Sequence, residues 1–191
     1  MFKIQAPMQA IVAHLYVKPE GAAAFEKIFE GAATRVHTEE PGCLLYQLCR
    51  NPDKPGKYTV LEIYTDEAAV KEHMANNAKH RNPEAEKLMA GPPEVHVLPV
   101  SGTPVVKPGS PQGVSTVEFQ VTDSAVVGRT ADSSSLVFCV GINAKTKRGI
   151  VLHLTAEAEQ KWKADPAVFQ GAKRTQLVPV GPAGIKPQAK L

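Results

Sequence analysis

The side chains best suited to chemistry lie between residues 58 and 80. The segment Tyr58–Tyr64 (YTVLEIY) carries Glu62 and Tyr64, and the following segment carries His73 and His80. A histidine exchanges protons near neutral pH, and neighbouring carboxylates and phenols can hold or pass on the proton that it takes. We therefore predict an acid–base site with His73, Glu62 and Tyr64 as its catalytic candidates and no metal.

The two histidines are seven residues apart, which is close to two turns of a helix. If one helix carries both, they share a face, and one of them can line a pocket. The alternative is that His73 packs on a sheet while His80 lies in solvent near Pro83. His80 is a candidate for ligand binding, as is Asn76 between the two histidines.

Glu62 stands between Leu61 and Ile63 in an apolar segment. A buried carboxylate without a partner is costly or has a raised pKa. We favour a pairing of Glu62 with a cation where two sheets meet, and a position in a pocket is the alternative.

Two further ring-bearing residues, Tyr46 and His14, are candidates for ligand contact. Tyr46 lies on the strand that precedes Glu62, and His14 projects from the first strand beside Val12 and Tyr16. Tyrosines more often serve as amphipathic core or interface residues than as catalysts. A core or interface position is likewise the favoured interpretation of His14.

The order of elements in residues 1–100 predicts a ferredoxin-like α+β fold. Alternating apolar residues indicate strands, and an apolar stripe that includes Phe25 and Phe29 indicates a helix. A β-α-β-β-α-β layout gives an antiparallel sheet with helices on one face. The predicted strands are Met8–Val17, Cys43–Arg50, Lys57–Thr65 and Glu94–Val100, and the predicted helices are Glu20–His37, 66–77 with Asp66 or Thr65 as cap, and Pro83–Met89.

Residues 101–114 (SGTPVVKPGSPQGV) are rich in Pro, Gly and Ser, which is typical of a linker. We place a domain boundary there, between a domain at 1–100 and a second α+β domain at 115–191. In the second domain a helix is expected at Ala156–Ala164, anchored by Trp162, and the expected strands are Ser115–Val121, Leu136–Asn143, Gly149–Leu154 and Gln176–Val180.

The two halves contain weakly similar sequence segments. The segment EIYTDEAAVKEHMANNA resembles LHLTAEAEQKWKADPAV, and VHVLPV resembles TQLVPV. This similarity suggests that the second domain is a degenerate repeat of the first. Coincidence between two α+β segments is the alternative.

Composition bounds the class of protein. With 43% hydrophobic and 21% charged residues the chain reads as a soluble globular protein. A net charge of +3 with scattered lysines gives nucleic-acid binding little support, and no apolar stretch approaches the roughly 18 residues of a membrane span. The N-terminus does not resemble a signal peptide, so we expect a cytoplasmic location. Cys43, Cys49 and Cys139 form no CxxC motif and are read as buried thiols.

Residues 8–100 resemble the antibiotic biosynthesis monooxygenase (ABM) domain family. The resemblance rests on the strand–helix opening with Phe25 and Phe29, the EPGCLLYQ turn and strand, the hairpin, the LEIYTDEAA junction, and His73 with His80. It implies a dimeric α+β barrel, in which two sheets meet face to face. A pocket then lies between each sheet and its helices.

The family includes cofactor-free oxygenases of quinols or polycyclic phenols, haem-degrading enzymes, and proteins without an assigned reaction. Cofactor-free oxygenation requires a protein to deprotonate a phenol, hold the anion in a dry pocket and polarise the forming oxyanion. The resemblance therefore implies a cofactor-independent monooxygenase that oxidises an aromatic, quinol- or phenol-like molecule with dioxygen.

The haem-degrading branch resembles this chain less well. That branch has an Asn on the first strand, where Ala13 stands here, and a Trp in the second helix, at a position near Glu72 or His73. Only His80 could replace its iron-binding histidine. Haem degradation of that type is therefore not expected, and haem binding through His80 stays an alternative.

Two other interpretations stay open. The protein is a non-catalytic barrel that binds a small apolar ligand or haem, or it is a scaffold whose second domain offers a surface to a partner. We expect a homodimer, or an intramolecular pseudo-dimer if the second half is a repeat. In either case, the sheet face that carries Val12, Tyr16 and Leu45 must pack against a partner, because such a face left exposed would promote aggregation.

Overall fold

A computed structural model describes residues 7–106, 113–120, 135–143, 148–155 and 173–185. The helix predicted at Ala156–Ala164, with Trp162, lies outside these residues. No helix in the described part of the chain is both long and apolar enough to cross a membrane.

The strands close into one barrel within a single chain, in the order β1-β3-β2-β8-β5-β7-β6-β4. The strands are β1 (Gln9–Tyr16), β2 (Cys43–Arg50), β3 (Lys57–Tyr64), β4 (Glu94–Val106), β5 (Gly113–Gln120), β6 (Ser135–Asn143), β7 (Arg148–Thr155) and β8 (Lys173–Ile185). Their pairings are antiparallel. The predicted α+β fold with a pseudo-dimeric barrel is confirmed.

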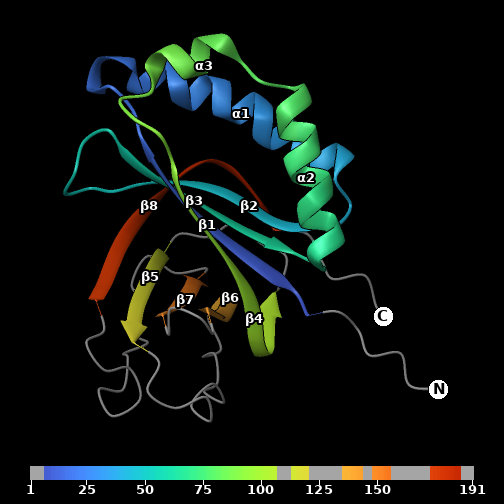
Figure 1. Cartoon of the computed structure of the whole chain (residues 1–191). Helices are drawn as coiled ribbons and strands as arrows, with labels where there is room; N and C mark the ends of the chain where they lie inside the picture. The colour runs from blue at the N-terminus through green and yellow to red at the C-terminus, as the bar shows by residue number, and fades with distance from the viewer. Residues whose placement is uncertain (1–6, 107–112, 121–134, 144–147, 156–172, 186–191) are drawn as a thin grey trace.

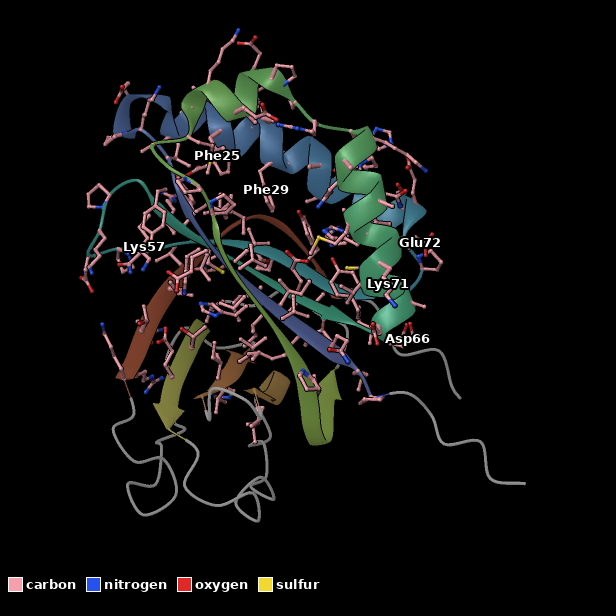
Figure 2. The ribbon with its side chains drawn as sticks, in the orientation of Figure 1. Phe25, Phe29, Lys57, Asp66, Lys71 and Glu72 are labelled. Carbon is pink, nitrogen blue, oxygen red and sulfur yellow. The ribbon has the colours of Figure 1, made fainter. Side chains whose placement is uncertain are left out.

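The helices of the first half cover one face of its sheet (Figure 1). They are the 3₁₀ turn η1 (Pro19–Gly21), α1 (Ala22–Glu39), α2 (Glu67–Lys79) and α3 (Pro83–Leu88). Asp66 caps α2, since its side chain accepts a hydrogen bond from the backbone N–H of Ala69 at 2.9 Å. Figure 2 shows Phe25 and Phe29 of α1 directed toward the sheet.

Alternation along each strand divides the core into two layers. One layer fills the barrel and includes Val12, Leu45 and Leu61 of the first half with Leu152 and Leu177 of the second. The other layer lies between the sheet and the helices. The face that carries Val12 and Leu45 is therefore covered by the second half of the same chain.

The two halves share strand order and register. The first half runs β4-β1-β3-β2 and the second runs β8-β5-β7-β6, so each follows the ferredoxin-like order. A register shift occurs opposite Tyr64 and Ile63 in the first half, and opposite Thr155 and Leu154 in the second. Counting from this shift, His153 holds the register position of Glu62.

The linker prediction differs from the structure at residues 101–106. These residues continue β4, and Val105 and Val106 pair with β6. Pro104 has no N–H to donate, and the register shift between Ser101 and Val105 places it where the ladder is interrupted. The Pro- and Gly-rich composition concealed a strand that joins the two halves.

We predict that Gly141→Ala destabilises the barrel at this junction. An added Cβ would lie 2.6 Å from the Leu98 Cβ, and overpacking of this kind costs about 1–3 kcal/mol. Urea unfolding measures the loss. Gly31→Ala is the matched control, because no atom lies within 4 Å of its added Cβ, and it should be neutral or stabilising. Equal behaviour of the two variants would contradict the packing shown at the β4–β6 junction.

Candidate acid–base site

Three of the predicted residues meet between α2 and the sheet. Glu62 and Tyr64 alternate along β3, so both face the helices, and the Tyr64 hydroxyl donates a hydrogen bond of 2.7 Å to Glu62. His73 projects from α2 and places its Nε2 3.6 Å from the same carboxylate. His73 is 1% exposed and Glu62 is 5% exposed, so this acid–base pair is shielded from water.

Glu40 is the second carboxylate of the site. It caps the C-terminus of α1, and its Oε2 lies 2.7 Å from His73 Nδ1. Its Oε1 accepts hydrogen bonds from Arg35 at 2.9 Å and from Asn76 at 3.4 Å. Glu40 therefore fixes the His73 ring from the side opposite Glu62.

Asn77 completes the polar shell around His73. Its Nδ2 lies 2.7 Å from His73 Nε2, and its Oδ1 accepts a hydrogen bond of 3.1 Å from Arg35. Arg35 thus holds both Glu40, which contacts Nδ1 of His73, and Asn77, which contacts Nε2.

The two carboxylates have opposite pKa shifts. Burial alone would raise the pKa of Glu40, but the hydrogen bonds from His73, Arg35 and Asn76 outweigh it, and the pKa lies below its ordinary value. Burial raises the pKa of Glu62, and the charge of Glu40 adds to that rise, while His73 and Tyr64 offset it in part. Carboxylates with diverging pKa values beside one imidazole can divide acid and base roles.

Tyr46 connects this cluster with a pocket. Its ring lies 5.4 Å from the His73 ring and stacks on Phe29 at 5.2 Å. The pocket has a volume of about 390 Å³ and lies between α1 and strands β2 and β8, where Phe29, Ala33, Tyr46, Leu48 and Val180 form its apolar wall and Glu26, Lys27 and Glu30 its charged rim. Burial, with the charge of Glu62, raises the pKa of Tyr46 well above its ordinary value.

The favoured interpretation of Glu62 differs from the structure. Glu62 faces the helices rather than the layer where the two sheets meet, and its contacts are Tyr64 and His73. Ile11 of β1 pairs with Glu62 of β3 and belongs to the layer between the sheet and the helices. Because paired residues on neighbouring strands point to the same face, the Glu62 carboxylate also points toward the helices.

The structure does not bring His80 or His14 to the cluster. His80 is exposed at the C-terminal end of α2. His14 lies on the other face of the sheet, where its Nδ1 is 3.1 Å from the Thr59 hydroxyl and its Nε2 is 4.0 Å from Glu118. Burial and the charge of Lys57 lower the pKa of His14.

Sequence reasoning missed Glu40, Arg35 and Asn77. In the sequence, Glu40 appears only as the residue before the Pro41–Gly42 turn. A signal was present, because a carboxylate at the C-terminus of a helix opposes the helix dipole and needs another reason to be there. Arg35 and Asn77 gave no comparable signal, since both types are common on solvated helix faces.

The first half matches a known family model. Residues 8–82 match the antibiotic biosynthesis monooxygenase family. A proposed antibiotic biosynthesis monooxygenase from Caulobacter crescentus is 38% identical over 51% of this chain and 93% of its own, with a TM-score of 0.45. The chain belongs to this family. No curated protein matches the sequence of the chain.

Two solved structures share the fold of the whole chain. A proposed monooxygenase from Lactobacillus acidophilus is 13% identical, covers 95% of this chain and 100% of its own, and has a TM-score of 0.74. Another from Fusobacterium nucleatum is 15% identical, covers 96% of each chain, and has a TM-score of 0.79. This ABM protein therefore shares with them the single-chain barrel of two halves.

We predict opposite pH behaviour for two charge-neutralising variants. The folded-state pKa of Glu40 is lowered, so its contribution to stability is present above the ordinary pKa of 4.5 and is lost as pH falls through the folded value. Glu40→Gln should destabilise the protein at neutral pH by about 3 kcal/mol, because Arg35 loses the buried negative charge that pairs with it. This deficit should shrink in acid.

Glu62 behaves in the opposite sense because its folded-state pKa is raised. Its ionisation penalises folding as pH rises above 4.5. Glu62→Gln should therefore be neutral or stabilising at neutral pH and lose this advantage in acid. Urea unfolding at about pH 7 and pH 4 measures both variants. The same pH trend in both would contradict the assigned roles.

Proposed function

We propose that this ABM protein is a cofactor-independent monooxygenase that oxidises a small aromatic, quinol- or phenol-like molecule with dioxygen. One observation carries the proposal. A buried histidine, held by a carboxylate at Nδ1 and facing a second carboxylate at Nε2, lies one aromatic ring away from an apolar pocket.

The lining of the pocket supports a planar aromatic molecule as the ligand. Phe29 and Tyr46 stack with an interplanar angle of 3° and form part of its wall. Flat aromatic surfaces favour offset stacking with another ring. Lys27 at the rim supplies a positive charge for a phenolate, and a volume of about 390 Å³ is within the range of small-molecule sites.

Proton removal begins the proposed reaction. His73 is the base, and Glu40 stabilises the imidazolium that forms. Tyr46 lines the pocket and stands between it and His73, so we assign it the transfer of the proton. Because the pKa of Tyr46 is raised, its hydroxyl stays protonated at neutral pH and serves as a relay and hydrogen-bond donor.

The substrate anion then reduces dioxygen. One electron passes from the phenolate to dioxygen, and the resulting radical and superoxide combine to a peroxide. The peroxide anion takes back the proton held by His73, and loss of water with the hydrogen of the attacked ring carbon leaves a quinone. One oxygen atom thus enters the product and the other leaves as water. A water-poor site supports these steps, since it strengthens the electrostatic interactions with the anion.

A ligand-binding protein without turnover is the second candidate. Of the cluster residues His73, Glu40, Glu62, Tyr64 and Tyr46, only Tyr46 belongs to the pocket lining. A molecule in the pocket therefore contacts the acid–base cluster through one residue. Oxygen uptake separates this candidate from the enzyme.

We predict that His73→Gln lowers oxygen uptake about 100-fold or more, the contribution expected of a general base. A panel of hydroquinones, naphthols and polycyclic phenols is offered to the protein in an oxygen electrode. His80→Gln is the matched control, because it changes an exposed histidine on the same helix, and its rate should equal that of the wild type.

Binding measured by calorimetry with the same phenols completes the test. Binding without oxygen uptake would favour the ligand-binding candidate over the oxygenase. Equal rates for His73→Gln and wild type would remove His73 as the base even if the protein turns over.

Haem binding through His80 has less support. His80 does not belong to the pocket lining, and Ala13, which stands where the haem-degrading branch has Asn, is buried under the helices. We predict that a haem titration produces no shift of the Soret band that depends on His80. A Soret shift that is lost in His80→Ala would restore the haem alternative.

A further inference from the structure

We propose that Arg35 and Asn77 are positioning residues that keep His73 neutral, with its proton on Nδ1 and the lone pair of Nε2 unprotonated. The tautomer follows from the contacts alone. Its importance for turnover rests on the proposed function.

The orientation of the Asn77 amide is determined by Arg35. A guanidinium has only donors, so the Asn77 atom that lies 3.1 Å from Arg35 Nη2 must be the oxygen. The amide nitrogen then points to His73 Nε2 at 2.7 Å. An amide NH₂ is a donor, and Nε2 must therefore accept.

The other ring nitrogen is determined by Glu40. An ionised carboxylate only accepts hydrogen bonds, and the Arg35 guanidinium, 2.9 Å from Glu40 Oε1, favours the ionised form of Glu40. His73 Nδ1, at 2.7 Å, must donate to it. Together the two contacts leave His73 one proton, on Nδ1.

This assignment opposes the local charge. His73 lies between two carboxylates, with Tyr46 and Tyr64 as the other titratable groups against its ring. Glu40 and Glu62 alone would favour the imidazolium. The Asn77 amide occupies the position of an Nε2 proton and disfavours that form. Arg35 is thus required twice, because one guanidinium orients both Glu40 and Asn77.

The arrangement has a consequence for proton transfer. A base that is already protonated cannot take a proton from a substrate. Asn77 reserves the Nε2 lone pair until a proton arrives, and rotation of the amide then lets the Nε2 proton reach Glu62, 3.6 Å away. Asn77 acts through His73 and is a positioning residue rather than a catalytic one.

Nitrogen-15 NMR of histidine-labelled protein tests the proposal, followed between about pH 5 and pH 8. In the wild type, His73 should show a protonated Nδ1 and an unprotonated Nε2 at neutral pH. Asn77→Asp replaces the NH₂ donor by an acceptor, and His73 should then show two protonated nitrogens. Asn76→Asp adds the same charge one residue away, where the side chain hydrogen-bonds Glu40 rather than Nε2, and should leave Nε2 unprotonated.

Arg35→Lys provides a second variant that retains the charge. A lysine is a point charge that does not reproduce the fork of arginine, so the preference for the Nδ1 proton should weaken. An Nε2-protonated wild type, or Asn77→Asp with an unchanged His73 spectrum, would overturn the proposal. Circular dichroism confirms that each variant is folded.

Turnover supplies an independent readout. If the protein is an oxygenase, Asn77→Asp should lower kcat about 100-fold at neutral pH with little change in KM, because the base is already protonated. If no phenol is oxidised, the proposed function fails while the NMR result still decides the tautomer.

Discussion

The hydrogen bond between Glu40 and His73 is the contact on which the candidate site depends. It joins the end of α1 to the middle of α2 and presses both onto the sheet beside Glu62. Neither Glu40 nor His73 could be buried here as a charge without the other, since a buried charge without a partner is strongly destabilising. Arg35 and Asn77 complete the shell, so that the loss of either one removes a hydrogen bond from another member of the cluster.

Periodicity was sufficient to predict the elements of the first half. The strand alternation placed Glu62 and Tyr64 on one face, and the Asp66 cap fixed the start of the helix that carries His73. The contacts of Glu40 could not be predicted in this way. They join α1 to α2 across 33 residues of sequence, and no local pattern encodes which helix ends meet. His80 shows the same limit. Its spacing of seven residues from His73 suggests a shared helix face, but spacing does not tell where the helix ends, and α2 ends just before His80.

The similar sequence segments of the two halves align one residue out of step with the strand pairings. Alignment by letters matches Thr155 with Thr65, whereas the strand pairings match Thr155 with Tyr64. A shift of one residue moves each side chain to the opposite face, so the letters would have matched Glu62 with Leu152. The shared strand order supports a repeat, and the register shows that His153 rather than a carboxylate stands at the Glu62 position.

The closure of the barrel within one chain removes a constraint that identical subunits obey. In a symmetric dimer, a residue near the two-fold axis meets its own copy, so an acid there would face an acid. His14 and Glu118 hold matching register positions in the two halves and lie 4.0 Å apart across the barrel. A single chain can place unlike partners at such a position. Each half is likewise free to diverge, and only one needs to retain the acid–base residues.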